Sequence, residues 1–159
     1  MKKLIVLVCS FFIISCSSND DTVCCLSTVI DNDLNITYVD AEGNNLLEGE
    51  DAITVNVITV FHKINSEWVE YSEANLDAPK GISIFEGNSG KFLRIFVSTK
   101  TDNAMISETK MVFDDGDENI FKTLISRESG NIIVTKVWID NELKWEASDM
   151  TARNFTSVK

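Results

Sequence analysis

The four cysteines and the single histidine are the side chains best suited to covalent, nucleophilic or metal-binding chemistry, and Cys16 has the clearest context. Lys2 and Lys3 precede an apolar run over Leu4–Ile14, which is shorter than the roughly 20 residues that a membrane-spanning helix needs. A basic start before a short apolar run is typical of a secretory signal. The small Ser15 predicts cleavage between Ser15 and Cys16, which leaves the Cys16 thiol available for covalent attachment.

The segment Ile13–Cys16 resembles the lipobox of bacterial lipoproteins, in which an aliphatic residue, a permissive position and a small residue precede the cysteine. The resemblance implies a diacylglycerol group on Cys16. Cys9 lacks this context because the residue before it, Val8, is not small. The acidic run Ser17–Asp21 resembles the surface-export signal of Bacteroidota-type lipoproteins. That likeness implies a lipid-anchored protein of the outer membrane, exposed at the cell surface.

The chain divides into three parts on these grounds. Residues 1–15 are interpreted as the cleaved signal peptide, residues 16–27 as a short flexible tether, and residues 28–159 as one folded domain. Asp21-Thr22-Val23 resembles the acceptor site for O-glycosylation in the same class of lipoproteins, which implies a glycan on Thr22.

Cys24 and Cys25 are adjacent, and neighbouring Cα atoms about 3.8 Å apart are closer than the usual disulfide range of about 4.4–6.8 Å. A strained vicinal bridge, an intermolecular disulfide and a metal-binding pair are the alternatives, and we expect a structural or incidental pair. Zinc needs three or four ligands, and His62 is the only histidine, so we expect no metal site and no cofactor. Because residues 28–159 contain no cysteine, the domain depends on apolar burial for its stability.

The net charge of the chain restricts its partners. Cleavage before Cys16 removes Lys2 and Lys3 and no acidic residue, which changes the formal net charge from −11 to −13. Nucleic acid and anionic lipid both attract basic surfaces, so neither is expected to bind this chain electrostatically. The lipid on Cys16 must therefore provide the contact with the membrane.

The sequence predicts no catalytic residues. His62 ends an apolar stretch, and nothing near it resembles a nucleophile motif, so we expect it to face solvent or a neighbouring side chain. The acidic segment 114–118 could bind calcium, but it lacks the order of an EF-hand and is interpreted as a solvated hairpin turn. A small hydrolase is the least favoured function.

The three tryptophans, Trp68, Trp138 and Trp145, are the remaining candidates for ligand contact. Trp138 and Trp145 would stack on sugar rings if they were exposed side by side. Core or cross-strand packing is the favoured alternative, since large aromatic side chains are mostly buried.

Alternating apolar and polar residues predict an all-β fold. Leu34, Ile36 and Tyr38 alternate with polar or smaller residues, and Ile53–His62 is the strongest strand signal, apolar on both faces like a central strand. Further strands are expected at Glu67–Tyr71, Ile82–Glu86, Lys91–Thr99, Met105–Phe113, Asn119–Arg127, Asn131–Ile139, Leu143–Trp145 and Phe155–Val158. About eight or more short strands at this spacing predict a single antiparallel β-sandwich.

Residues 34–47, an extended segment followed by an Asp-Ala-Glu-Gly-Asn turn and two leucines, resemble the transthyretin-like, carboxypeptidase-regulatory type of sandwich. Lys136–Trp145 and Phe155–Lys159 resemble stretches of small surface lipoproteins of unknown function. These likenesses imply a binding or structural module, and the absence of a catalytic constellation predicts that the protein is not an enzyme. The expected function is a membrane-anchored envelope lipoprotein, with a carbohydrate-binding accessory as the alternative, and the expected partners are a glycan or other envelope proteins.

Overall fold

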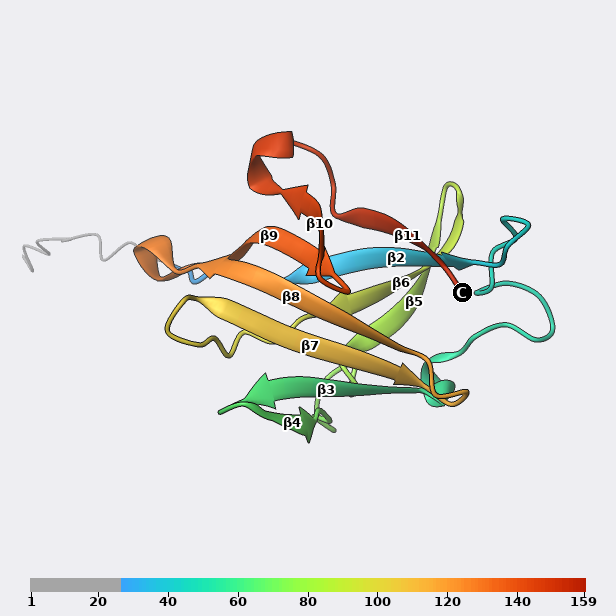
Figure 1. Ribbon diagram of the computed structural model, residues 1–159, viewed down its shortest axis with the longest axis horizontal. Helices are drawn as coiled ribbons and strands as arrows, with labels where there is room; N and C mark the ends of the chain where they lie inside the picture. The colour runs from blue at the N-terminus through green and yellow to red at the C-terminus, as the bar shows by residue number, and fades with distance from the viewer. Residues whose placement is uncertain (1–26) are drawn as a thin grey trace, which may run out of the picture.

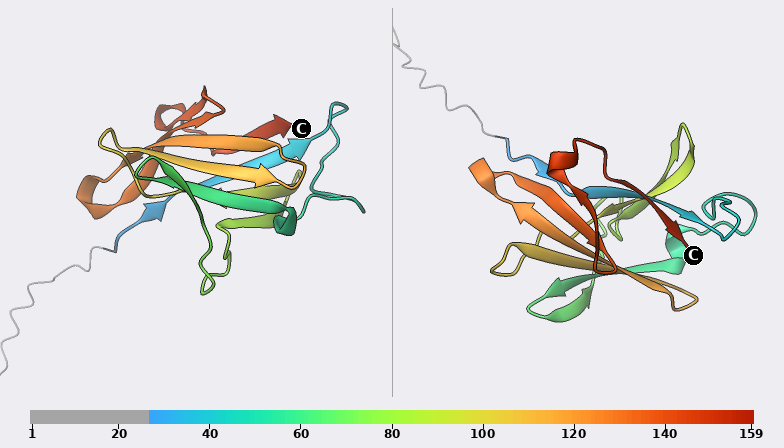
Figure 2. Two further views of the ribbon diagram at one scale, coloured as in Figure 1. Left: turned by 60° about the horizontal axis from the view of Figure 1, so that its bottom comes forward. Right: turned by 45° about the horizontal axis from the view of Figure 1, so that its top comes forward.

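The computed structural model describes residues 27–159, which form an all-β sandwich of eleven strands in two sheets (Figure 1). Seven strands belong to one sheet and four to the other, and the inner faces of the two sheets share the apolar core. Figure 2 shows the same two layers from two further directions. The predicted all-β sandwich is therefore confirmed.

The larger sheet has the strand order β1-β9-β8-β7-β3-β4, and β10 pairs with the edge of β9 that β1 also occupies. All its neighbouring strands are antiparallel except β1 and β9, which run parallel. The strands are β1 (Ile30–Asp31), β3 (Ile58–Ile64), β4 (Glu67–Glu70), β7 (Ile106–Phe113), β8 (Glu118–Ser126), β9 (Ile132–Ile139) and β10 (Glu142–Glu146).

The smaller sheet has the order β11-β2-β6-β5, in which β11 runs parallel to β2 and the other pairs are antiparallel. Its strands are β2 (Asp33–Val39), β5 (Ile82–Gly87), β6 (Gly90–Phe96) and β11 (Asn154–Val158). Three single-turn 3₁₀ segments lie between strands: η1 (Val55–Val57), η2 (Glu128–Gly130) and η3 (Ala147–Asp149).

The two parallel pairs, β1 with β9 and β11 with β2, depart from the purely antiparallel sandwich that the sequence predicted. Neighbouring strands joined by a tight turn must run antiparallel, but β1 and β11 lie far along the chain from their partners. A strand that reaches its neighbour through a long connection can pair in either direction. Local alternation therefore predicted these strands without fixing their direction.

Strand β2 illustrates how the alternating pattern builds the core. Leu34, Ile36 and Tyr38 each expose 1% of their surface or less, as the sequence predicted. Burying a large apolar side chain of this kind contributes about 1.5–3 kcal/mol. The Tyr38 ring packs edge-on against Phe113, and its hydroxyl donates to Asn119 Oδ1 at 2.9 Å. Burial raises the pKa of the Tyr38 hydroxyl, so it stays protonated and can donate.

Strand β3 is shorter than the predicted Ile53–His62. Its regular pairing begins only at Ile58, because the Ile53 N–H donates to the Leu46 carbonyl and residues 55–57 form η1. The Lys80 ammonium donates to the carbonyls of residues 55, 56 and 58 at 3.1, 3.2 and 2.9 Å. A lysine from a distant part of the chain therefore provides hydrogen-bond donors for the carbonyl groups of this turn. The strand does lie inside the sheet, between β7 and β4, but only one of its faces is fully buried.

Two hairpin turns have the backbone geometry that suits a two-residue connection between antiparallel strands. Asn65 and Ser66 between β3 and β4 have φ of 50° and 71°, and Asp140 and Asn141 between β9 and β10 have φ of 49° and 69°. Two successive positive φ angles define the type I′ turn, whose twist matches that of a two-residue hairpin.

Candidate functional site

The residues predicted to carry the anchor lie outside the described part of the chain. Ser15, Cys16, Thr22, Cys24 and Cys25 all precede residue 27. Cleavage before Cys16, its lipidation and the glycan on Thr22 therefore stay predictions. Within residues 27–159, no helix has both the length and the apolar character that crossing a membrane requires.

Trp138 and Trp145 lie on opposite faces of the hairpin formed by β9 and β10. Trp138 is opposite Leu143, but a bulge between Leu143 and Trp145 shifts the register, so that Trp145 is opposite Val137. Because neighbouring residues in a strand point to opposite faces, this shift places Trp145 on the core side and Trp138 on the outer side. Without the bulge the two indoles would share the outer face. The structure therefore does not bring the proposed stacking pair together.

Each of these indoles already has partners within the protein. Trp145 packs against the core, its Nε1 donates to the Thr151 carbonyl at 3.0 Å, and the Arg153 guanidinium lies 5.5 Å from the ring centroid. Trp138 is half-buried, and the Lys122 ammonium lies 5.7 Å from its ring centroid. These contacts fit packing roles for both side chains.

His62 lies on the core side of β3 and faces a neighbouring side chain, one of the two environments that the sequence predicted. Its imidazole stacks on the Tyr71 ring, with centroids 4.2 Å apart and planes inclined by 24°. Its neighbours across the two adjoining strands are Val69 and Thr109, neither of which is charged. Among residues 27–159 its Nε2 atom finds no hydrogen-bond partner. Burial lowers the pKa of His62 to about 4, so the ring is neutral near pH 7.

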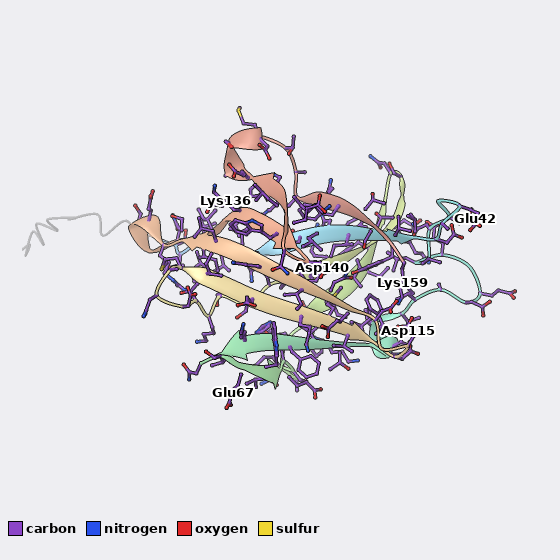
Figure 3. The ribbon with its side chains drawn as sticks, in the orientation of Figure 1. Glu42, Glu67, Asp115, Lys136, Asp140 and Lys159 are labelled. Carbon is purple, nitrogen blue, oxygen red and sulfur yellow. The ribbon has the colours of Figure 1, made fainter. Side chains whose placement is uncertain are left out.

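The acidic turn between β7 and β8 holds the C-terminal lysine of the sequence. The Lys159 ammonium donates to Asp115 Oδ2 at 2.6 Å and to Asp117 Oδ2 at 2.7 Å, and it lies 4.3 Å from the Phe113 ring centroid. Figure 3 shows Lys159 beside Asp115 at the end of the sandwich that also carries Glu42. The hydrogen bond from Lys159 lowers the pKa of Asp115. Two of the four carboxylates considered for calcium therefore bind an ammonium group, and no cluster of three metal-ligating side chains occurs within residues 27–159.

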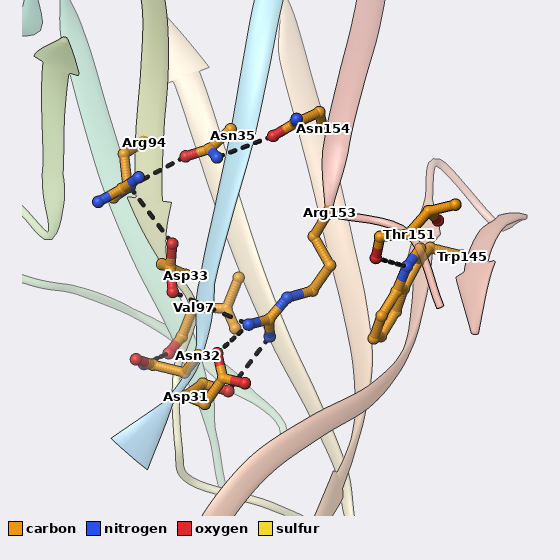
Figure 4. A network of polar contacts seen from close by, with 10 residues as sticks. All are labelled: Asp31, Asn32, Asp33, Asn35, Arg94, Val97, Trp145, Thr151, Arg153 and Asn154. Carbon is orange, nitrogen blue, oxygen red and sulfur yellow. Dashed lines mark hydrogen bonds and ion pairs between the residues drawn. The ribbon is translucent and has the colours of Figure 1, made fainter. Parts of the chain in front are cut away.

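Arg153 joins the two ends of the folded segment. Its guanidinium is largely buried, contacts the Asp31 carboxylate, and donates to the Asp31 carbonyl at 3.2 Å (Figure 4). Asp33 lies 3.8 Å away on the next strand. Because Asp31 belongs to β1 and Arg153 immediately precedes β11, these contacts tie the edges of both sheets together. Every group in this cluster has a partner, which fits a structural role.

One groove differs from the other main hollows of residues 27–159 because no charged side chain lines it. Its volume is about 430 Å³, and its residues come from the adjacent strands β2 and β11 and from the β5–β6 hairpin. It is lined by Asn35, Thr37, Phe92, Asn154, Phe155 and the hairpin turn at residues 87–90. We call this hollow the uncharged groove.

The polar side of the uncharged groove is built from a repeated triplet. Asn35–Thr37 and Asn154–Thr156 have the same pattern, Asn-x-Thr, and the parallel register places Asn35 opposite Asn154 and Thr37 opposite Thr156. The side chains of Asn35 and Thr37 point outward because residues 34, 36 and 38 point into the core. The Asn35 Nδ2 atom donates to Asn154 Oδ1 at 2.8 Å, so the two amides are coupled.

A larger hollow of about 700 Å³ lies beside the β3–β4 turn and is charged, but most of its charges are already paired. Lys63 forms an ion pair with Glu108 at 2.9 Å, Arg127 donates to the Thr99 carbonyl, and Asp102 accepts the N–H groups of residues 104 and 106. These bonds fix the loops at this end of the sandwich. Few charged groups in this hollow are therefore free to bind a ligand.

Sequence reasoning missed the uncharged groove because its strands are distant in the chain. Asn35 and Asn154 are 119 residues apart, and neither is an unusual residue for a strand or a turn. The repeated Asn-x-Thr triplet was the available signal. It becomes meaningful only when the two strands are known to pair in parallel and in register.

No match to this chain was found among protein-family models, curated proteins or solved structures.

Proposed function

We propose that this chain is a non-enzymatic lipoprotein of the cell envelope, anchored through Cys16, whose β-sandwich is a binding module. The outer membrane is the proposed location, with the sandwich exposed at the cell surface. The formal net charge of −11 supports attachment through lipid, since an acidic chain is repelled by anionic headgroups. A lipobox at residues 13–16 supplies the attachment chemistry.

The observation that carries the binding role is the uncharged groove. Acid–base and nucleophilic catalysis need a titratable group within hydrogen-bond reach of the substrate. The residues that line the groove include no acid, lysine, arginine, histidine or cysteine. Its hydroxyl groups, from Thr37 and Ser89, have no base beside them within the groove. A hollow with this lining favours binding without turnover.

The position of the groove supports presentation to a partner outside the membrane. The described chain enters the sandwich at β1, where Ile30 is opposite Ile132 at the start of β9. The turn at residues 87–90 lies toward the opposite end, as both views in Figure 2 show. A membrane anchor that precedes β1 would therefore leave the hairpin end of the groove away from the lipid.

The anchor is tested by replacing each cysteine of the signal region in turn. Cys16→Ser removes the sulfur that would carry the lipid, so we expect the protein to move from the detergent-rich to the aqueous phase in detergent phase partitioning, or to remain uncleaved. Cys9→Ser is the matched control and should leave partitioning unchanged, because Cys9 lies inside the signal. Protease treatment of intact cells then measures surface exposure.

Replacing Asp20 and Asp21 should reduce exposure at the surface without changing lipidation. The anchoring proposal would be wrong if the Cys16→Ser protein lost residues 1–15 and still partitioned into detergent, since the anchor would then lie elsewhere.

A further inference from the structure

We propose that the uncharged groove binds a neutral glycan, with Phe92 contacting the apolar face of a sugar ring and Asn154 donating to its hydroxyl groups. This inference rests on the proposed binding function, but it does not depend on the lipid anchor. It assigns the ligand contact to the outer face of the smaller sheet and not to the tryptophans of β9 and β10.

The lining of the groove selects against charged ligands. The other three main hollows of the described chain include charged residues, for example Lys63, Asp33 and Lys159. The nearest cation, Arg94, lies 5.7 Å from the Phe92 ring centroid and is already paired with Asp33 at 3.3 Å. A phosphate, carboxylate or ammonium group entering the uncharged groove would therefore lose water without gaining a free opposite charge. A neutral sugar requires only hydrogen-bond donors and acceptors, together with an apolar surface. At about 430 Å³ the groove falls within the range of about 300–1,000 Å³ that is typical of small-ligand sites.

A chain of hydrogen bonds fixes the orientation of the Asn154 amide, as Figure 4 shows. Asp33 lies 3.3 Å from Arg94 Nε, which donates to Asn35 Oδ1 at 2.9 Å. Asn35 Nδ2 then donates to Asn154 Oδ1 at 2.8 Å. Because each amide must present its oxygen to the donor before it, the Asn154 nitrogen is left for another acceptor. Among residues 27–159 this nitrogen forms no hydrogen bond, so a sugar hydroxyl can accept from it.

The other polar side chains of the groove are also uncommitted. Within the described residues, Thr37, Asn88 and Ser89 donate and accept no side-chain hydrogen bond. They add two hydroxyl groups and one amide to the free donors of Asn154. Hydroxyl and amide groups are matched to sugars because both sides of the contact can donate and accept.

The aromatic part of the groove is held in place before any ligand arrives. Phe92 stacks on Phe85, with ring centroids 5.8 Å apart, and the Arg94 guanidinium lies 4.8 Å from the Phe85 centroid. On its edge, Phe92 Cε1 comes within 3.1 Å of the place where a side chain at Gly87 would begin. Glycine at this position therefore allows the ring to lie against the hairpin. An ordered ring loses little entropy when a sugar packs on it.

The test measures binding of the protein expressed with its signal region and purified in a zwitterionic detergent, because a detergent with a sugar headgroup would compete. The probes are neutral oligosaccharides built from glucose, mannose, galactose and N-acetylglucosamine, with uronic-acid oligosaccharides of the same length as the charged comparison. Isothermal titration calorimetry then gives the affinity of every probe that an initial array detects. We expect at least one neutral probe to bind and to bind at least tenfold more tightly than its charged counterpart.

Asn154→Asp is the sharpest variant because it keeps the oxygen that accepts from Asn35 and replaces the free NH2 group with a negatively charged oxygen, which accepts hydrogen bonds but donates none. We expect at least a tenfold loss of affinity with an unchanged circular dichroism spectrum. Phe92→Leu keeps an apolar side chain without the flat ring and should cause a similar loss. Trp138→Ala, on the other sheet, is the matched aromatic control and should bind as the natural protein does.

Two results would overturn the proposal: no neutral probe binds, or binding survives both groove variants with unchanged affinity, whatever the effect of Trp138→Ala. Cys16→Ser should bind the same probes with unchanged affinity. Failure of the anchor and failure of the groove are therefore distinguished by different variants and different assays.

Discussion

The two sheets differ in where they leave polar atoms without partners. Both buried side-chain polar atoms that lack a partner among the described residues belong to the larger sheet, where His62 Nε2 and Thr123 Oγ1 face the core. On the outer face of the larger sheet, lysines form ion pairs with glutamates and lie over aromatic rings, and we call it the committed outer face. In the smaller sheet, the fully buried side chains of the inner face are apolar apart from the Tyr38 hydroxyl, and the amides and hydroxyls of the uncharged groove face outward.

Buried polar atoms without a partner reduce the stability of the fold, whereas exposed ones remain available to bind a ligand. A buried donor or acceptor without a partner has lost its water and gained nothing, which costs about 1–3 kcal/mol. An exposed one keeps its water until a ligand replaces it. Predictions that change the buried atoms should therefore alter folding, whereas those that change outward-facing groups should alter folding little.

The largest expected effect is the loss of stability on acidification through His62. The unfolded chain takes up a proton on this histidine near pH 6.5, whereas the folded protein does so only near pH 4. The stabilising contribution is therefore complete above pH 6.5 and is lost as the pH falls toward 4. A difference of this size corresponds to about 3 kcal/mol. Urea denaturation at a series of pH values measures it.

His62→Phe is the control for this titration, because phenylalanine keeps an aromatic ring against Tyr71 and has no proton to gain. The variant should lose less stability than the natural protein between pH 6.5 and 4. Carboxylates such as Asp115, whose pKa is lowered, contribute equally to both proteins and cancel in the difference. Parallel pH profiles of the two proteins would contradict the assignment.

Substitutions of two buried threonines in adjacent strands should change the stability of the fold by an intermediate amount and in opposite directions. Thr123 and Thr109 are both fully buried, but Thr109 Oγ1 accepts the Ser98 N–H at 2.8 Å, whereas Thr123 Oγ1 finds no partner among the described residues. Thr123→Val removes an unsatisfied hydroxyl and should stabilise the fold by about 1 kcal/mol. Thr109→Val leaves the buried Ser98 N–H without an acceptor and should destabilise the fold by about 1–2 kcal/mol.

Urea denaturation of the two threonine variants at pH 7 measures this contrast. If both substitutions changed the stability in the same direction, the absence of a partner at Thr123 would not be the relevant difference between them.

Much of the fold could be predicted from the sequence, because the alternation of apolar residues is local. The pattern at residues 34–38 depends only on neighbouring residues, and so it predicted the strand and its buried side. The direction of β11 and the start of β3 depend on distant partners, β2 and the Lys80 ammonium. The side of Trp145 depends on a bulge between Leu143 and Trp145, which simple alternation does not predict. One extra residue in a strand turns every later side chain to the opposite face.

The candidate site was less predictable than the fold, for a related reason. Trp138 and Trp145 were candidates because of their residue type. Whether they form a binding surface depends on the strand register, which the β9–β10 bulge shifts. Asn35 and Asn154 have ordinary side chains, and only the parallel pairing of their strands makes them a unit. A binding site made of common residues cannot be predicted from the sequence until the strand pairing is known.

The smallest expected effect concerns the committed outer face of the larger sheet. Lys136 and Glu146 are cross-strand partners, their charged atoms lie 2.8 Å apart, and their side chains are 38% and 33% exposed. Water screens a pair with this exposure, so a double-mutant cycle with Lys136→Gln and Glu146→Gln should give a coupling of about 0.5 kcal/mol or less. Raising the salt from about 0.1 M to 1 M shortens the screening length from about 10 Å to 3 Å and should reduce the coupling further. A coupling above about 2 kcal/mol that survives high salt would mean that the pair is effectively buried. The outer face of the larger sheet would then contribute to the stability of the fold as the core does, and the contrast between the two sheets would fail.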